Sequence, residues 1–373
     1  MKSTSKRLLS LDILRGITIS GMILVNNPGS WQYVYAPLKH AEWNGLTPTD
    51  LVYPFFMFIM GVAIYLSLHK FNKNDTYIWT KVARRTILLF GVGLALCCFS
   101  MLCQEEFAWG KVRIMGVMQR LALAYAGGSI LTLIASPKHY LSIAGGILIA
   151  YIVILQCFNG YAQDGSNLIS IIDVQLLGAS HLITQTSTSG SFPFEPEGLL
   201  STLPCWAHVL IGSYIGYLIV QLNDHKEKVR KIALAGIVLL FCGFLLQYLD
   251  PINKKLWTSS YTLVTCGAAS LLLALLIEII DVYGKKRWTH FFEVFGVNPL
   301  FMYCVAWIVS SLFSIPFIPW NEEYISVKGE LYNHIFLPIV GDYLASLIYA
   351  ILFIGLIWCI GYPLYRKHIY IKL

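Results

Sequence analysis

A dense group of polar side chains directly precedes an apolar run in residues 39–61, KHAEWNGLTPTDLVYPFFMFIMG. His40 is the group there best suited to proton transfer, because an imidazole titrates near neutral pH and can act as a general base. A packed structural role is the alternative for such a lone histidine. Thr47 and Pro48 fit the first turn of a helix, where the Asp50 carboxylate would favourably meet the helix dipole. Orientation of His40 is the other role open to Asp50.

Further polar side chains lie at the ends of other apolar segments, where burial makes each one costly. Asp12 and Arg15 are three residues apart near the start of the first segment, so they either pair with each other or form a polar site. Asn26 lies where that segment ends. Gln119 and Arg120 lie just inside a later segment, and an arginine among apolar neighbours needs a buried anion or a network of acceptors.

The composition shows which elements must hold these groups. Hydrophobic residues make up 57% of the 373 residues and charged residues 13%, about half of the ~25% usual in soluble domains. A soluble globule could not cover that much apolar surface with so few charges. This composition excludes disorder, a coiled coil and a nucleic-acid-binding module, and it predicts an all-α polytopic membrane protein.

Ten apolar segments are long enough to span a bilayer or nearly so. They are 8–26, 51–69, 82–103, 116–135, 139–158, 199–222, 230–249, 258–280, 291–314 and 342–365. Most Lys and Arg fall in the short loops on the side of the N-terminus, which predicts a bundle of about ten helices with both termini in the cytoplasm. The long loops 27–50, 159–198 and 315–341 would then lie outside, and the run TQTSTSGS within 159–198 is typical of a flexible exposed loop.

Two charged pairs fall in the predicted outer loops. Glu195 and Glu197 either complement the dipole of the following helix or bind a cationic substrate. Lys254 and Lys255 depart from the positive-inside trend, so they are either ordinary surface lysines or functional groups. The nine cysteines form no CxxC pair and fall in or near apolar runs, where they behave as small hydrophobes, so no metal site is predicted.

Seven pieces of the chain together resemble the heparan-alpha-glucosaminide N-acetyltransferase family, membrane enzymes of the wider transmembrane acyltransferase group. The pieces, in family order, are SLDILRG (10–16), LVNN (24–27), KHAEWNGLTPTDLVYPFFMFIMG (39–61), GVMQRLALAY (116–125), EPEGLLSTLP (195–204), NKKLWTSSYTL (253–263) and FGVNPLFMY (295–303). The HAEWNGLT piece is specific and the apolar remainder is not. The resemblance implies one transmembrane acyltransferase domain over residues 1–373, of a compact bacterial type that lies in the inner membrane.

The resemblance also implies a reaction, in which acetyl moves from cytoplasmic acetyl-CoA to the amine of a terminal glucosamine. The family's active-site histidine falls on His40 and its neighbouring asparagine on Asn26. The other polar positions of the family fall on Asn44, Asp50, Gln119, Arg120, Glu197 and Ser260. We expect Gln119 and Arg120 to bind acetyl-CoA. We expect the amino-sugar acceptor to be bound by Asn44, Glu197 and Ser260.

The residues fit this chemistry in outline. Acyl transfer to an amine needs a base for its proton and donors for the oxyanion, roles that His40 and the Asn26 amide can fill. The phosphates of CoA need cations at the inner mouth, for which Arg15, Arg84 and Arg85 are the candidates. Direct attack by the amine and an acetyl-histidine intermediate both remain open.

Rival functions also remain open at this stage. A ten-helix bundle with polar residues in its interior would suit a transporter of a sugar or a cell-wall fragment. The large apolar surface can be covered by the lipid bilayer or by a second copy of the chain in a homodimer.

Overall fold

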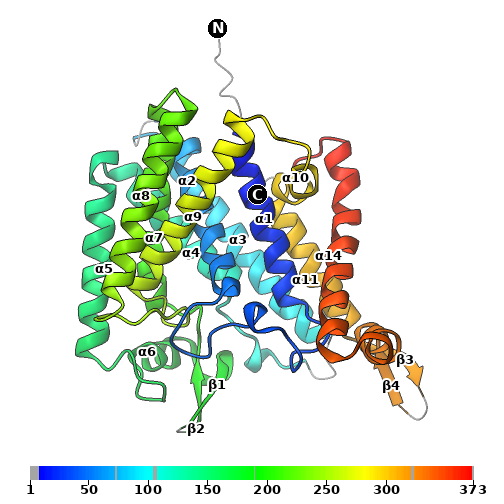
Figure 1. Ribbon diagram of the computed structural model, residues 1–373. Helices are drawn as coiled ribbons and strands as arrows, with labels where there is room; N and C mark the ends of the chain where they lie inside the picture. Colours follow the sequence, from blue (N-terminus) through cyan, green and yellow to red (C-terminus); the bar gives the residue numbers. More distant parts are fainter. Residues whose placement is uncertain (1–7, 72–73, 104–106, 189, 321–322, 372–373) are drawn as a thin grey trace.

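The chain folds into a bundle of long helices, seen side by side in Figure 1. This computed structural model describes residues 8–71, 74–103, 107–188, 190–320 and 323–371. Within them, nine helices are long and apolar enough to cross a membrane, and a bent pair makes up to ten. The protein is an integral multi-pass membrane protein. Its long helices are α1 (Leu9–Asn26), α2 (Val52–Leu68), α3 (Thr76–Leu102), α4 (Val117–Ile134), α5 (Tyr140–Cys157), α7 (Leu203–Gln221), α8 (His225–Leu246), α9 (Ser259–Leu276), α10 (His290–Val297), α11 (Pro299–Phe313) and α14 (Asp342–Arg366).

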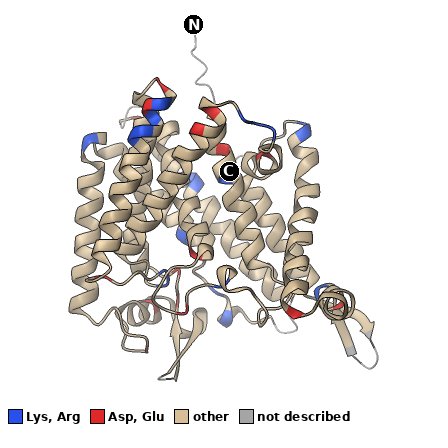
Figure 2. Cartoon of the chain, viewed as in Figure 1, with Lys and Arg blue, Asp and Glu red and all other residues tan. Residues whose placement is uncertain are grey.

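Each predicted span coincides with one of these helices or with the bent pair, which confirms the all-α membrane fold. Among the described residues, α1 begins and α14 ends at the same end of the bundle (Figure 1). Lys and Arg gather at this end in Figure 2, and we call it the basic end. Some of the Lys and Arg residues behind the predicted orientation lie outside the described residues, in 1–7, 72–73 and 372–373. We call the opposite end, where α2 begins, the His40 end.

The ninth predicted span, 291–314, is not one straight helix. It is the pair α10 and α11, bent by 88°. Proline lacks a backbone N–H and disfavours helical geometry in the residue before it, so Asn298, ahead of Pro299, leaves the helix with φ −127° and ψ 56°. The Asn298 amide then donates to the Ile369 carbonyl (2.8 Å) and accepts from the Ile371 N–H (2.9 Å). The segment after α14 is thereby fixed to the bend.

Glycines allow the central helices to approach closely. Gly61 of α2 and Gly212 of α7 face each other, and a Cβ on either would collide with the backbone of the partner helix. Gly16 of α1 and Gly296 of α10 form a second contact of this kind. Small residues at helix crossings are the usual way to obtain close packing in a bilayer, where no hydrophobic force drives helices together.

The described part of loop 159–198 contains regular structure. The run TQTSTSGS is mostly exposed, as predicted, but it belongs to a hairpin and is not an irregular loop. The loop forms α6 (Leu168–Leu177) and a hairpin of β1 (Ile183–Ser187) with β2 (Gly190–Phe194), paired from Ile183 opposite Phe194 to Ser187 opposite Gly190. Phe192 and Phe194 are buried on one face of the hairpin, against a cluster that includes Leu256. This burial orders the hairpin even though TQTSTSGS is polar.

A second hairpin, β3 (Pro316–Trp320) and β4 (Glu323–Ser326), extends beyond the bundle in Figure 1.

Candidate functional site

His40, Asp50 and Lys254 form a compact cluster at the His40 end. His40 Nδ1 lies 2.7 Å from Asp50 Oδ1. A carboxylate only accepts hydrogen bonds, so Nδ1 carries a proton, and in the neutral form of the imidazole the lone pair is on Nε2. Lys254 Nζ lies 2.9 Å from Nδ1, 3.5 Å from Nε2 and 3.4 Å from Asp50 Oδ1. The His40 side chain is 43% exposed whereas Asp50 is 1% exposed, so a buried anion holds an accessible imidazole.

The contacts of Asp50 fit both of the roles that the sequence left open. Its Oδ2 accepts from the backbone N–H of Ala41 (3.1 Å), and from the N–H (3.1 Å) and hydroxyl (2.9 Å) of Thr47. Thr47 is the N-cap of the short 3₁₀ helix η2 (Pro48–Leu51), which confirms the predicted helix start. The other oxygen, Oδ1, remains for the imidazole. The Tyr261 hydroxyl of α9 donates to the Asp50 carbonyl (2.6 Å) and ties this turn to the bundle.

A second charged cluster comes from the segments that precede α4 and α7. It joins Arg113, ahead of α4, to Glu195 and Glu197, ahead of α7. Arg113 Nε and Nη2 donate to Glu195 Oε2 and Oε1 at 2.8 and 2.5 Å, and Nη2 also donates to Glu197 Oε2 at 2.6 Å. Burial raises the pKa of Glu195 to about 7 despite these bonds. Burial alone would lower the pKa of Arg113, but its bonds to Glu195 and the charge of Glu197 raise it above its ordinary value.

Arg120 is buried in the first turn of α4, with 1% of its surface exposed. Its guanidinium donates to the Ser201 hydroxyl and lies over the Trp257 ring, 5.0 Å from the ring centre. Trp257 packs edge-on against Tyr53 of α2, with 5.3 Å between ring centres. The neighbouring Gln119 is equally buried. Both predicted acetyl-CoA residues on α4 therefore lie in the core of the bundle.

The other two residues predicted to bind the acceptor, Asn44 and Ser260, both contact the segment just before α9 that contains Lys254. The Asn253 amide donates to Asn44 Oδ1 (3.1 Å). Ser260 is fully buried, its N–H donates to Asp250 Oδ2 (2.9 Å), and its hydroxyl contacts the Thr258 hydroxyl (3.3 Å). Ser260 thus holds the start of α9, and Asn44 joins the His40 loop to it.

A cavity of about 710 Å³ lies at the basic end. Arg15, Lys81 and Arg85 are among its lining residues, and Arg15 also donates to Asp12 Oδ1 (3.0 Å). Tyr370 and Ile371, from the segment that Asn298 holds, form another part of its wall. The rest of its lining is mostly apolar and comes from Phe56, Ile59, Met60, Ala63, Leu89, Leu121, Val297, Pro299 and Leu300. Arg84 is exposed and is not among the lining residues, so the structure separates Arg84 from Arg85.

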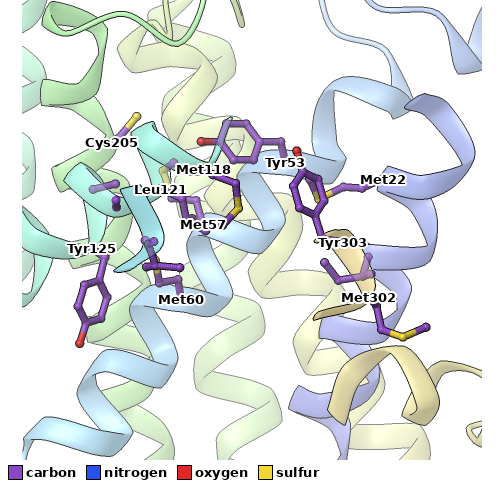
Figure 3. Close-up of a cluster of buried hydrophobic side chains, with 14 of the residues drawn as sticks. Met22, Tyr53, Met57, Met60, Met118, Leu121, Tyr125, Cys205, Met302 and Tyr303 are labelled. Atoms are coloured by element: carbon purple, nitrogen blue, oxygen red, sulfur yellow. The ribbon is translucent and has the colours of Figure 1, made fainter. Parts of the chain in front are cut away.

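A narrow void of about 10 Å³ continues from this cavity toward the His40 end. It shares Phe56, Leu121 and Leu300 with the basic cavity, and Met22 and Tyr303 with a third cavity of about 270 Å³. Figure 3 shows Met22, Tyr53, Met118, Leu121 and Tyr303, five of its lining side chains, across the centre of the bundle. The void is about the size of one water, so passage along it requires these side chains to move.

Asn26 lines the third cavity and not the His40 cluster. Asn26 and Asn27 end α1 there, together with hydroxyls of α3 and α11 that include Ser100 and Ser311. The described contacts of His40 run instead to Asp50 and Lys254. The contacts therefore join His40 to Asp50 and Asn44 to the segment of Lys254, whereas Asn26 lines a cavity whose lining includes none of these residues.

Sequence reasoning assigned no role to three of these cations. They are Lys81, Arg113 and Lys254, of which only Lys254 had a functional role left open, as an exception to the charge trend. Lys81 stands four residues before Arg85 on α3. That i, i+4 spacing puts both side chains on one helix face and could have identified the pair.

Comparison with known proteins shows the family of this chain. The sequence profile described as "Heparan-alpha-glucosaminide N-acetyltransferase, catalytic" matches residues 7–250, more than half of the chain. The chain belongs to this family. The human heparan-alpha-glucosaminide N-acetyltransferase is 28% identical over an alignment of 350 positions, gaps included, that covers 80% of this chain and 52% of the human protein. The mouse protein of the same name is 26% identical over an alignment that covers all of this chain and 61% of the mouse protein. The chain thus spans between half and two thirds of these relatives.

The family match covers the His40 cluster only in part. Residues 7–250 contain His40, Asp50, Arg113, Arg120 and the two glutamates, whereas Lys254 comes four residues after the matched range. The described helices α9, α10, α11 and α14 also follow it. The site of this member of the heparan-alpha-glucosaminide N-acetyltransferase family is therefore built from both sides of that boundary.

Proposed function

We propose that this protein is a transmembrane acetyltransferase that moves acetyl from cytoplasmic acetyl-CoA to the amine of glucosamine or of a terminal glucosaminide on the outer side. One observation carries the proposal: a carboxylate-oriented imidazole lies at one end of the bundle and a cavity with three basic side chains at the other. The basic end then faces the cytoplasm, in agreement with the positive-inside rule. A bacterial inner membrane is the location we assign.

His40 acts as the general base in this proposal. Asp50 holds Nδ1–H, so Nε2 accepts the proton of the acceptor amine while the amine nitrogen bonds to the thioester carbon. The C–S bond then breaks, and the CoA thiolate takes the proton from His40. We favour direct attack because a bound amine at high effective molarity needs no additional covalent step.

The basic cavity is the binding site that we assign to acetyl-CoA. Arg15, Lys81 and Arg85 supply charge-assisted hydrogen bonds for the phosphates, and the apolar wall suits the remainder of the molecule. The pantetheine arm would follow the narrow void toward Tyr53, one helical turn beyond Asp50. The flexible methionines there, Met22 and Met118, can adapt to its passage.

Substitution of Arg85 by alanine is expected to raise the KM for acetyl-CoA about 10-fold or more, since a hydrogen bond to a charged group contributes about 1.5–3 kcal/mol. The matched comparison is Arg84→Ala, one residue away and outside the cavity lining, which should raise KM much less. Initial rates against acetyl-CoA concentration give both values. Equal effects from the two variants would place the phosphate site elsewhere.

The proposed activity is tested by incubating purified protein in detergent with acetyl-CoA and a panel of amino sugars, with mass detection of N-acetylated products. Absence of acetylated amino sugar would reject the function. Acetyl-CoA without acceptor separates the two mechanisms, because a stoichiometric burst of CoA with acetylated His40 would exclude direct attack.

The alternative function, transport, is favoured by one observation, the row of three cavities across the bundle. It predicts accumulation of a sugar in proteoliposomes without acetyl-CoA. The acetyltransferase predicts no accumulation under those conditions.

A further inference from the structure

Lys254 lies over the imidazole of His40 in an unusual position. Its Nζ is within 3.5 Å of both ring nitrogens, at 2.9 Å from Nδ1 and 3.5 Å from Nε2. The in-plane bonding direction of each ring nitrogen points away from the other, so an atom this close to both lies over the face of the ring. The ammonium therefore leaves the Nδ1–H bond to Asp50 intact and the Nε2 lone pair free.

The segment before α9 fixes this position. The Asn253 side chain accepts from the Leu256 N–H (2.9 Å) and donates to Asn44 (3.1 Å), and the Asn253 N–H donates to the Thr258 hydroxyl (3.0 Å). Asn253 is fully buried. The Lys254 side chain is 19% exposed, so most of it is held within the protein and the ammonium end is directed by this turn.

Arg113, Arg120 and Lys255 have different partners. Arg113 is bound to the two glutamates, and Arg120 is bound to the Ser201 hydroxyl and stacked on Trp257. Lys255 donates to Gln185 Oε1 at 2.8 Å. Lys254 is thus the described cation in contact with the imidazole, and an ammonium has three N–H donors of which the carboxylate can occupy one.

Acetyl transfer to an amine creates a negative charge on the carbonyl oxygen, beside the base that takes the proton. Donors preorganised for that oxygen usually contribute more to the rate than any other group. Asn26, which the family resemblance suggests near His40, lines the cavity of about 270 Å³, whose lining does not include His40. A donor close to the imidazole but off the lone-pair direction of Nε2 is needed, and Lys254 Nζ, 2.9 Å from Nδ1 and 3.5 Å from Nε2, has such a location.

We propose that the Lys254 ammonium donates a hydrogen bond to the carbonyl oxygen of the acetyl group as this oxygen becomes negatively charged. The inference rests on the proposed acetyltransferase function and adds a catalytic residue to it. When the amine nitrogen bonds to the carbonyl carbon, the π electrons move to the oxygen, which Lys254 stabilises, and the amine proton moves to His40 Nε2. The electrons return as the C–S bond breaks.

The proposal requires Lys254 to be charged while His40 is neutral. Burial lowers the pKa of Lys254. The negative charges of Asp50 and Glu197 oppose this shift by stabilising the ammonium, and the positive charge of Arg120 adds to it. His40 contacts the ammonium as well. Activity is therefore expected to fall on the alkaline side as Lys254 loses its proton.

Steady-state kinetics of Lys254→Met and Lys254→Arg in the purified full-length protein test the proposal. We expect Lys254→Met to lower kcat about 10²–10³-fold, the usual cost of one oxyanion donor, with the KM for acetyl-CoA unchanged. Lys255→Met, the adjacent lysine bound to Gln185, is the matched control and should retain wild-type kcat. The elution volume on gel filtration shows whether each variant is folded.

Lys254→Arg supplies the decisive pH profile, because a guanidinium stays protonated throughout the accessible range. Its alkaline limb of kcat should move to higher pH relative to the wild type, which a purely structural role would not cause. Wild-type kcat in Lys254→Met, or an unmoved alkaline limb in an active Lys254→Arg, would overturn the role of Lys254 while leaving the acetyltransferase intact. A wild-type protein without acetyl transfer would instead reject both.

Discussion

Substitution of His40 by alanine is expected to lower kcat for amino-sugar acetylation by about 10²–10⁴-fold, the usual contribution of a positioned general base. The acceptor amine must lose a proton as it attacks, and the alanine variant has no group at Nε2 to receive it. The KM for acetyl-CoA should change little, because the lining of the basic cavity includes neither His40 nor its partners Asp50 and Lys254. The measurement is product formation at saturating acetyl-CoA.

The structure indicates that this variant will fold. His40 is in a loop and 43% exposed, and Asp50 keeps its bonds to Ala41 and Thr47 when the imidazole is removed. His334→Ala is a suitable control, since His334 contacts Glu330 within η8 (Glu330–Phe336), after the second hairpin. Full activity in His40→Ala would exclude the assignment of the base, and a comparable loss in His334→Ala would indicate a nonspecific effect.

The membrane fold was predictable because its signal is local. Each span is a continuous apolar run, and its length is set by the bilayer. The bend at Asn298 also had a local signal, since Pro299 removes a helical hydrogen bond and restricts the residue before it. The hairpin at 183–194 did not, because its order depends on Phe192 and Phe194 packing against residues such as Leu256.

The His40–Asp50 contact was within reach of the sequence because the two residues are ten apart and a capped helix start fixes Asp50. The Lys254 contact joins residues 214 apart, so it depends on how α9 packs against α2. The choice between Arg84 and Arg85 depends on the rotation of α3 about its axis, which the apolar residues around them do not determine. Such contacts are properties of tertiary packing and have no local sequence pattern.

Removal of the cation at Arg113 is expected to produce the largest loss of stability. Glu195 is fully buried and Glu197 is 14% exposed, and Arg113 Nη2 donates to both. Breaking a buried ion pair by removing one partner typically costs about 3–5 kcal/mol, because the remaining charge is left uncompensated. Arg113→Met should therefore unfold at a clearly lower temperature in detergent, whereas Lys111→Met, at an exposed lysine two residues earlier, should change the unfolding free energy by at most about 0.5 kcal/mol.

The pH dependence of this loss identifies its cause. Burial already raises the pKa of Glu195 to about 7 with Arg113 present. Burial alone would raise the pKa of Glu197 too, but the charges of Arg113 and Arg120 hold it below its ordinary value. Without Arg113 the folded-state pKa of both carboxyl groups should rise. A carboxylate whose folded-state pKa is raised adds stability at low pH and loses it as pH rises through that value. The difference between Arg113→Met and the wild type should therefore be smaller near pH 5 than near pH 8.

The triple variant Arg113→Met, Glu195→Gln, Glu197→Gln separates lost charge pairing from lost packing. It removes the uncompensated charges while keeping side chains of nearly the same size, so it should recover most of the stability lost in Arg113→Met. A pH-independent loss that the two glutamines do not repair would mean that Arg113 stabilises the fold through its packing. The charge explanation would then be wrong, and the two glutamates would need another source of stabilisation in the core of the His40 end.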